Sequence, residues 1–370
     1  KKDVGKNDVL YIHVTLVPYI SAAGELKTKP TQHSVKELQS VGIQPDILVL
    51  RTEHELSTNL KKKVALFCNV DDNAVVQSMD MPTIYEVPLR MQEQKLDVTI
   101  LEKMGLPVGE TPALGPWKAF LERRHKATEK VKIGLVGKYD LQDAYKSIRE
   151  ALSQAATYND RKADIHFINS EKLTEENIEE SLKDMDGIII CPGFGQRGIE
   201  GKFTAIKYCR THNVPTFGIC LGMQCMAIEF ARDVLGYTDA NSREMDEKTP
   251  HNVIDIMEEQ KSITNMGGTM RLGAYECVLD PNSKVYQAYQ SEHIQERHRH
   301  RYEFNNDYKA EFEAAGMKCV GINPDSDLVE IIEIPTLKWF IGTQFHPEYS
   351  STVLKPHPLF LSFIKAAIDK

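Results

Sequence analysis

A cysteine that lies between two glycines is the first feature of this sequence that could perform chemistry. The stretch Gly218-Ile219-Cys220-Leu221-Gly222 has the spacing of a G-x-S-x-G nucleophile elbow, with sulfur in place of oxygen. In such an elbow a strand turns sharply into a helix, and the glycines remove side chains that would clash there. The partial positive charge at the helix N-terminus favours the thiolate, which is the reactive form of the side chain. A buried structural cysteine is the alternative, because free cysteine is among the most buried residue types.

A histidine and a glutamate near the end of the chain could complete a catalytic triad. His346 and Glu348 belong to the stretch QFHPE, which follows the apolar stretch WFIGT. Because they are two residues apart at a predicted strand end, both side chains can point to one face. His346 could take the thiol proton and return it to a leaving amine, while Glu348 holds the imidazole tautomer. A lone surface histidine is the alternative, since the chain contains 12 histidines. The presence of both motifs at strand ends favours the triad.

A third strand end could provide an oxyanion hole for acyl transfer. Gly193 lies in the stretch CPGFG, and a glycine after a strand can offer its backbone N–H to a developing oxyanion. The N–H of Leu221, directly after the cysteine, is the natural second donor. Glycines after a strand are usually only part of a turn, so this segment supports an acyl-transfer site without establishing one.

These three motifs need a sheet that brings strand ends together, and the sequence predicts one. Apolar strand signals alternate with helical patterns such as residues 146–158. This alternation predicts an α/β fold with a mostly parallel sheet and helices on both of its faces. From about residue 275 onward the predicted strands follow one another more closely. The strands are expected at residues 131–139, 163–169, 187–191, 216–219, 318–322, 328–334 and 340–345.

Composition divides the chain into two α/β domains joined by a linker. Residues 107–130 hold three prolines followed by a run of charges, which is typical of a linker. The first domain covers residues 1–106, and the second covers residues 131–370 and holds all of the candidate catalytic residues. The elements predicted in the first domain are buried strands at residues 9–18 and 46–52 and a helix at residues 34–41.

Composition and charge exclude several classes of protein. The 370 residues carry a formal net charge of −8, which argues against a general nucleic-acid binder. No apolar run approaches the roughly 18–20 residues of a membrane span, and the N-terminus shows no signal-peptide core. The seven cysteines form no C-x-x-C pair, which argues for reduced thiols rather than a disulfide framework or a zinc site. We therefore expect a cytoplasmic protein with no membrane and no nucleic-acid partner.

Taken together, the motifs resemble those of the CTP synthase family. FGICLGMQ, PGFGQRGIEGK, ERHRHRYE and QFHPE are similar to motifs of its class I glutamine amidotransferase domain. MGGTMRLG and KTKPTQ are the stretches that point to CTP synthase specifically. The resemblance extends over essentially the whole chain. It implies the C-terminal part of a P-loop-type α/β synthetase domain, followed by a flavodoxin-like class I glutamine amidotransferase domain with a mostly parallel sheet.

The activity that this resemblance implies is a step of pyrimidine biosynthesis. A CTP synthase is a ligase that forms a C–N bond, because it aminates UTP to CTP at the expense of ATP. The ammonia comes from glutamine, which is hydrolysed at a Cys-His-Glu triad. Cys220 would be the nucleophile, with His346 and Glu348 completing the triad.

The resemblance also assigns a glutamine-binding role to residues of the second domain. Glu244 suits the α-amino group of glutamine and Arg301 suits its α-carboxylate, because each would pair with the opposite charge. The glutamine-binding residues that the family implies are Gly193, Leu221, Gly222, Met223, Gln224, Glu244 and Arg301.

Other positions match nucleotide-binding sites of the family. The lysines of KTKPTQ precede a predicted short helix, an arrangement that suits a triphosphate, although without the resemblance they indicate a solvated loop. Arg197 and Glu200 resemble the region implicated in binding the activator GTP. The residues implied for UTP or CTP are Lys27, Thr28, Lys29, Pro30, Thr31, Gln32 and Lys63, and those implied for ATP are Met79, Asp80 and Met81.

The family implies small-molecule partners and an assembly. The intact enzyme would take glutamine, UTP and ATP as substrates and would need Mg²⁺, with GTP as an allosteric activator and CTP as a feedback inhibitor. No tightly bound cofactor is implied. The implied assembly is a homotetramer, with filaments as a further form.

Two departures from the family pattern affect these expectations. Pro192 stands where the family usually has glycine, which removes one N–H donor and restricts the backbone. The chain also contains no P-loop, since GLVGKY and GIEGKF have the wrong glycine spacing and no hydroxyl after the lysine. We therefore expect part of a longer enzyme, with the Mg²⁺ ligands outside this chain, that keeps only the glutaminase chemistry. The alternatives are a GMP-synthetase-type glutaminase and a catalytically silent nucleotide-binding or assembly fragment.

The run of arginines and histidines in ERHRHR permits two further interpretations. His298 and His300 alternate on a predicted strand and could bind a metal ion, while the arginines could bind nucleic acid. The sequence reveals no third metal ligand, and the chain is acidic. Arg301 as a clamp for the substrate carboxylate is therefore the preferred interpretation.

Overall fold

The computed structural model describes residues 3–5, 8–139, 143–256 and 270–369.

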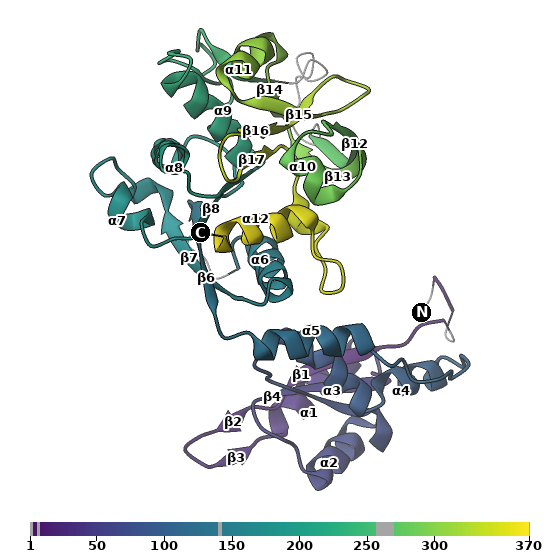
Figure 1. The fold of residues 1–370 in the computed structure, drawn as a ribbon. Coiled ribbons are helices and arrows are strands. Elements are labelled where there is room, and N and C mark those ends of the chain that lie inside the picture. Colours follow the sequence, from purple (N-terminus) through teal and green to yellow (C-terminus); the bar gives the residue numbers. More distant parts are fainter. Residues whose placement is uncertain (1–2, 6–7, 140–142, 257–269, 370) are drawn as a thin grey trace. The chain divides into compact units, whose positions relative to one another are not determined.

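The chain divides into two compact units, Lys1–Leu114 and Gly115–Lys370 (Figure 1). Within the stretch that the sequence predicts to be a linker, residues 107–114 form no helix or strand, whereas α5 (Gly115–Lys126) is a regular helix. Pro116 lies in the first turn of α5, where the missing N–H would have had no partner within the helix. A proline that is typical of linkers thus stands at the start of a helix.

The first unit contains a parallel sheet of order β1-β4-β5. The predicted strand over residues 46–52 is confirmed as β4 (Ile47–Thr52), which is buried except for Arg51. β1 (Ile12–Leu16) lies at the edge of the sheet and exposes Ile12, Val14 and Leu16, so the prediction of a fully buried strand is wrong there. The other elements of this unit are β2 (Tyr19–Ile20), β3 (Glu25–Leu26), β5 (Val75–Met79), α1 (Lys29–Ser40), α2 (Thr58–Cys68), α3 (Val87–Glu93) and α4 (Leu96–Lys103).

Helix α1 begins earlier than the predicted start at residue 34. Pro30 lies in its first turn, which suits the fixed φ angle of proline. The hydroxyl of Thr31 donates a hydrogen bond of 2.9 Å to the carbonyl of Leu16, which ties this turn to the end of β1. The sequence-based prediction omits the first turn of α1 because the residues of that turn are polar and include a proline.

The second unit is built on a nine-stranded sheet of order β13-β12-β15-β16-β17-β9-β8-β6-β7. The strands from β17 to β7 are parallel to one another, and those from β13 to β17 pair antiparallel. The bounds are β6 (Lys130–Gly137), β7 (Lys162–Asn169), β8 (Gly187–Ile190), β9 (Thr216–Ile219), β12 (Arg271–Leu279), β13 (His293–His300), β15 (Lys318–Ile322), β16 (Val329–Glu333) and β17 (Phe340–Thr343).

Helices cover both faces of this sheet, and each face has its own apolar core. Phe217 of β9 packs on one face against Phe360 and Phe363 of α12, in a core that also includes α6. On the other face, α8 and α9 pack against residues such as Ile190. The helices of this unit, besides α5, are α6 (Lys146–Tyr158), α7 (Ile178–Leu182), α8 (Ile199–Thr211), α9 (Leu221–Asp233), α10 (Lys284–Tyr289), α11 (Lys309–Ala315) and α12 (Pro358–Ile368).

A second, three-stranded sheet of the same unit has the order β10-β11-β14. Its strands are short: β10 (Asn241–Ser242), β11 (Asn252–Ile256) and β14 (Tyr302–Phe304). Glu244 follows β10, and Arg301 lies between β13 and β14. The segments next to this small sheet therefore hold Glu244 and Arg301, the two charged residues predicted to bind the α-amino and α-carboxylate groups of glutamine.

Across the part of the chain that the structure describes, no helix combines the length and the apolar composition needed to cross a membrane.

Candidate active site

Cys220 lies in a strained turn between β9 and α9. Its φ angle of 52° is in the left-handed region, which residues other than glycine rarely adopt. The neighbouring glycines leave no space for side chains. A Cβ on Gly218 would lie 2.3 Å from the sulfur of Met226, and a Cβ on Gly222 would lie 2.1 Å from the carbonyl oxygen of Ile190. Both glycines are therefore needed for this backbone, as in a nucleophile elbow.

Three neighbouring parallel strands carry the candidate catalytic motifs at their ends. β9 pairs with β17 on one side, where Ile219 is opposite Thr343, and with β8 on the other, where Gly218 is opposite Ile190. The carboxyl ends of parallel strands meet at one edge of a sheet. The residues that follow β8, β9 and β17 are thereby brought together, although they are far apart in the sequence.

His346 and Glu348 are joined by a hydrogen bond of 2.8 Å between Nδ1 and Oε1. Nδ1 is the donor, because a carboxylate can only accept. Both side chains are buried. They meet across a short 3₁₀ turn, Pro347–Tyr349, and not through the two-residue repeat of a strand as the sequence predicted. The strand ends at Thr343, and a proline at position 347 could not donate to a strand ladder.

The imidazole of His346 also contacts Cys220. Burial lowers the pKa of His346, but hydrogen bonds with Cys220 and Glu348 outweigh it and raise the pKa to about 10. The ring of Tyr349 stacks on the imidazole with centroids 5.3 Å apart. The backbone N–H of His346 donates to the carbonyl of Arg297 at 2.8 Å. The imidazole is therefore fixed in place and is protonated when a thiolate lies beside it.

A pocket at this edge of the sheet gathers most of the residues predicted to bind glutamine. Cys220 opens into it from the elbow, and Arg301 and Glu244 reach it from the segments next to the small sheet. The residues that line the pocket are Gly193, Phe194, Cys220, Leu221, Gln224, Glu244, Met270, His300, Arg301 and Tyr302.

The structure does not bring Gly222 and Met223 to this pocket. Met223 is fully buried in the apolar core between α9 and the sheet, with its side chain against Gly342. Gly222 faces the carbonyl of Ile190. In the first turn of a helix, only some successive residues can face one side, so the contiguous assignment from Leu221 to Gln224 does not hold for the side chains.

Glu244 has a second contact besides the pocket. Its Oε1 atom accepts a hydrogen bond of 2.9 Å from the backbone N–H of Gly195, in the loop after β8. A carboxylate can accept several hydrogen bonds, so this contact leaves capacity for an ammonium group of a ligand. Glu244 is therefore placed both to face a ligand and to hold the loop that contains Gly193.

Two buried lysines hold the same loop, although no motif in the sequence marks them. Lys202 Nζ donates to the carbonyl of Cys191 at 2.6 Å, and Lys138 Nζ donates to the carbonyl of Phe194. The peptide group after Phe194 is thus held at both ends, because its N–H is bonded to Glu244. Burial, followed by repulsion from Lys202, lowers the pKa of Lys138. A lysine directly after an apolar strand is the signal that could have suggested this role.

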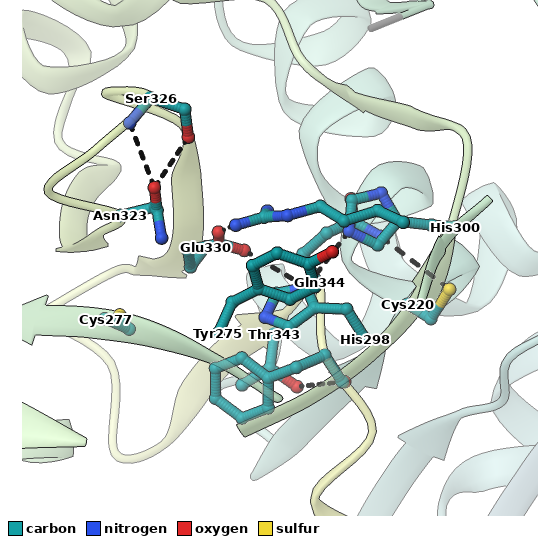
Figure 2. Close-up of polar contacts among 12 residues, drawn as sticks. Cys220, Tyr275, Cys277, His298, His300, Asn323, Ser326, Glu330, Thr343 and Gln344 are labelled. Carbon is teal, nitrogen blue, oxygen red and sulfur yellow. Dashed lines mark hydrogen bonds and ion pairs between the residues drawn. The ribbon is translucent and has the colours of Figure 1, made fainter. Parts of the chain in front are cut away.

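A buried polar cluster lies beside Cys220 and Gln344 (Figure 2). His298 Nδ1 is 3.0 Å from His300 Nε2 and 3.5 Å from an oxygen of Glu330. Arg271 donates to the other oxygen of Glu330 at 2.6 Å. Burial lowers the pKa of His298 to about 2 and that of His300 to about 3, so both rings are neutral. Burial also raises the pKa of Glu330 to about 7, although Arg271 opposes this shift.

This cluster bears on the metal-site interpretation of the histidines. His298, His300 and Glu330 present possible ligand atoms within 4.8 Å of one another, so Glu330 is the third ligand that the sequence did not reveal. Hydrogen bonds account for most of the contacts, although His298 Nε2 and Glu330 Oε2 are buried without a hydrogen-bond partner among the described residues. The carbonyl of Tyr302 accepts from His300 Nδ1 at 3.1 Å, which leaves Nε2 of that ring as an acceptor for His298 Nδ1–H. With Arg271 paired to Glu330, the cluster is best described as a hydrogen-bonded network.

The arginines of the same strand point the other way. In β13 the residues alternate between buried and exposed, so that His298 and His300 face inward while Arg297 and Arg299 face outward. These two arginines line an open hollow with Leu272 and Tyr349, next to the candidate triad.

The residues predicted to bind GTP lie outside both hollows described above. Arg197 forms an exposed ion pair with Glu171 at 3.1 Å, and its guanidinium lies over the ring of Tyr139. Glu200 lies in the first turn of α8, with one oxygen 3.4 Å from a guanidinium nitrogen of Arg232. Both residues therefore form ion pairs with other side chains of this chain at its surface.

All of the predicted UTP or CTP residues of the first unit except Lys63 lie at or directly before the start of α1. Lys27 pairs with Glu25, and Lys29 is the first residue of α1, so the predicted polar loop is in part a helix N-terminus. The positive end of the helix dipole suits an anion there. Thr28 and Thr31 are buried, whereas Lys63 is exposed on α2, which packs against α1.

The predicted ATP residues lie at the end of β5. Met79 is its last residue, and Asp80 forms a 2.6 Å ion pair with Arg51. Met79 lines a hollow of the first unit, whose other lining residues are Glu55, Lys61, Gln77, Arg90, Glu93 and Gln94. Of the motif MGGTMRLG, residues 266–269 lie outside the residues that the structure describes.

Two family descriptions match this chain, one in each unit. Residues 1–106 match the family "CTP synthase N-terminus", and residues 140–366 match "Glutamine amidotransferase class-I". Together these matches cover most of both units.

Curated relatives and one solved structure agree with these matches. A CTP synthase of Bacteroides thetaiotaomicron is 79% identical over 371 residues, which span 100% of this chain and 69% of that protein. A CTP synthase of Porphyromonas gingivalis is 61% identical over 369 residues, which span 100% of this chain and 68% of that protein. The structure titled "Trypanosoma brucei CTPS - glutaminase domain with bound acivicin" superposes with a TM-score of 0.61 at 38% identity. That match covers 65% of this chain and 95% of the other.

Proposed function

This chain belongs to the CTP synthase family and carries its class I glutamine amidotransferase domain, and on that basis we propose that Cys220, His346 and Glu348 hydrolyse glutamine in the second unit. The observation that carries the proposal is the contact of the elbow cysteine with the hydrogen-bonded His346–Glu348 pair. Relatives named CTP synthase match both units, so a GMP-synthetase-type glutaminase or a silent fragment is not favoured.

The proposed reaction begins with attack of the Cys220 thiolate on the side-chain amide carbon of glutamine. Protonated His346 then gives its proton to the amide nitrogen, the C–N bond breaks, and ammonia leaves a glutamyl thioester behind. Neutral His346 next takes a proton from water while the oxygen attacks the thioester, and the C–S bond breaks to release glutamate and the thiolate. Glu348 keeps Nδ1 protonated throughout, so that Nε2 exchanges the proton.

The pocket supports this chemistry through its charges. Glu244 is proposed to bind the α-amino group of glutamine, and Arg301 is proposed to bind its α-carboxylate. Gln224 lines the same pocket and is proposed to form hydrogen bonds with glutamine. The backbone N–H groups of Gly193 and Leu221 are proposed as the oxyanion hole. The loop after β8 is held by Lys138, Lys202 and Glu244, which supports its role as a rigid donor despite the proline at position 192.

The synthetase reaction of the family uses ATP and UTP, and we propose that the first unit contributes part of its site. Lys27 to Gln32 and Lys63 would contact UTP or CTP, and Met79 to Met81 would contact ATP. The helix N-terminus at Lys29 and the exposed lysines support a polyphosphate ligand. The ammonia would aminate the pyrimidine once ATP has activated it.

The residues at these positions do not fit a Mg²⁺ site. Mg²⁺ prefers carboxylate oxygens. The carboxylates of Glu25 and Asp80 are already paired with Lys27 and Arg51. Of the two carboxylates in the hollow beside Met79, Glu93 is paired with Arg90 and Glu55 interacts with Lys61. We therefore derive no step through Mg²⁺ from the residues of this chain.

Regulation, assembly and location are proposed from the family. GTP would activate the glutaminase near Arg197 and Glu200, and CTP would inhibit by competing with UTP. We propose a homotetramer, with filaments as a further assembly, and a cytoplasmic location. All seven cysteines are free, which supports a reducing compartment.

Replacement of the nucleophile tests the proposed function. The Cys220→Ser variant should lose glutaminase activity by about 10³-fold or more, because a serine hydroxyl is a far weaker nucleophile than a thiolate at neutral pH. Circular dichroism should be unchanged, since sulfur and oxygen differ little in size. Turnover that survives in a folded Cys220→Ser protein would refute the triad.

A further inference from the structure

Gln344 lies between β17 and the candidate triad and makes a contact with the nucleophile. It is fully buried, and its backbone N–H donates to the carbonyl of Glu330 at 2.8 Å. Its side-chain nitrogen Nε2 lies 3.7 Å from the sulfur of Cys220, and Figure 2 shows the two side chains facing each other. The reaction described above gives no role to this side chain.

The orientation of the Gln344 amide follows from its neighbours. The carbonyl oxygen of Tyr302 can only accept, so Gln224 must present its nitrogen to it, at 2.9 Å. The same nitrogen of Gln224 lies 3.2 Å from Gln344 Oε1, to which it donates its second hydrogen. Gln344 must therefore turn its oxygen toward Gln224 and its NH₂ group toward Cys220. A flipped amide would place two NH₂ groups against each other.

An N–H group aimed at a sulfur stabilises the thiolate more than the thiol. A thiol sulfur is a weak acceptor, whereas a hydrogen bond to an ionised group is roughly twice as strong as a neutral one. The low dielectric around a buried amide strengthens this difference. Among the described residues, the other titratable groups that interact with the sulfur include His346 and Tyr349. Glu348, Arg297 and Arg299 interact with these two in turn.

We propose that Gln344 is a further catalytic residue, which donates a hydrogen bond from Nε2 to the thiolate of Cys220 and is held in that orientation by Gln224. This inference rests on Cys220 being the nucleophile of the proposed function. It assigns two separate supports to the thiolate: the positive charge of His346 and the neutral N–H donor of Gln344. Because the donor is uncharged, its contribution does not depend on the protonation of His346.

The Gln344→Met variant tests this role, because methionine has a similar length and no N–H donor. The 370-residue protein is treated with iodoacetamide from pH 5 to pH 10, and the alkylation rate at Cys220 is followed by peptide mass spectrometry. Loss of one donor to an ionised group should move the pH midpoint of alkylation upward by about one unit. The kcat for glutamine should fall about tenfold, with a smaller change in KM.

A matched control removes a buried amide elsewhere in the same unit. Gln154 of α6 accepts a hydrogen bond from Ser351 and does not line the candidate pocket, so Gln154→Met should leave the pH midpoint unchanged. A second variant, Gln344→Leu, covers the case in which Gln344→Met does not fold, and it should shift the midpoint in the same direction.

The outcomes separate this inference from the proposed function. An unchanged midpoint in a folded Gln344 variant would overturn the inference, even if kcat fell, because it would show a purely structural role. Turnover in Cys220→Ser would instead overturn the proposed function. A midpoint that shifts in the Gln344 variants and not in Gln154→Met would support the inference.

Discussion

The carboxylate of Glu244 accepts the backbone N–H of Gly195 at 2.9 Å, and the same carboxylate lines the pocket that opens at Cys220. One side chain thus faces the proposed substrate and also holds the loop proposed to carry an oxyanion donor. The carbonyl on the other side of this peptide group is bonded to Lys138. In the proposed mechanism, Glu244 would therefore couple substrate binding to transition-state stabilisation.

Two substitutions of Glu244 separate these roles. Glu244→Gln keeps an oxygen for Gly195 and loses the charge for an α-ammonium group, so KM for glutamine should rise about 10–100-fold with kcat little changed. Glu244→Ala loses both contacts, so kcat should fall as well. Steady-state glutaminase kinetics measure the difference. Equal kcat in the two variants would show that the contact with Gly195 has no catalytic consequence.

The elbow geometry predicts a steric effect at Gly222. Because a Cβ there would lie 2.1 Å from the backbone oxygen of Ile190, Gly222→Ala should lower the free energy of unfolding by about 2 kcal/mol or more. Activity should also be lost, since Cys220 would move. Gly109→Ala is the control, because nothing lies within 4 Å of its Cβ position, and it should change stability by less than about 0.5 kcal/mol. Urea unfolding of the two variants compares these effects directly.

The raised pKa of His346 predicts a dependence of stability on pH. Folding raises this pKa from 6.5 to about 10, so the protonated imidazole stabilises the fold. That stabilisation is complete below pH 6.5 and is lost as the pH rises through about 10. The difference in free energy of unfolding between the wild-type protein and His346→Gln should therefore shrink between pH 6.5 and pH 10.

The Cys220→Ala background provides a control for this pH dependence. In Cys220→Ala one of the two hydrogen-bond partners of His346 is removed, so the pH dependence should be weaker in that background. A difference between wild type and His346→Gln that stays constant from pH 6 to pH 10 would contradict the proposed charge state.

The elements that the sequence predicts well are those with local signals. The helix at residues 146–158 and the strands at residues 216–219 and 318–322 are confirmed at both ends, because glycine, proline or polar residues bound each apolar run. The elbow at Cys220 is predicted from Gly218 and Gly222, each two residues away, and this spacing is also a local signal.

The contacts that the sequence does not predict depend on tertiary structure. Glu330 of β16 lies beside His298 of β13 because both strands belong to one sheet, and no local sequence pattern predicts that contact. The orientation of Gln344 depends on Gln224 and on the carbonyl of Tyr302, which come from two other elements. The sequence predicts a strand end at His346 and Glu348, whereas the chain forms a 3₁₀ turn there because Pro347 cannot donate to a strand ladder.

The most direct test of the account is covalent labelling of the nucleophile with a diazo ketone that mimics glutamine. The reagent needs the glutamine pocket and an activated thiolate at the same time, so it tests Cys220 and its surroundings together. Peptide mass spectrometry should find the label on Cys220 and on none of the other six cysteines. Glutaminase activity should fall in proportion to the labelled fraction, and excess glutamine should protect the site. Label on another cysteine, or full activity after complete labelling of Cys220, would contradict the proposed site.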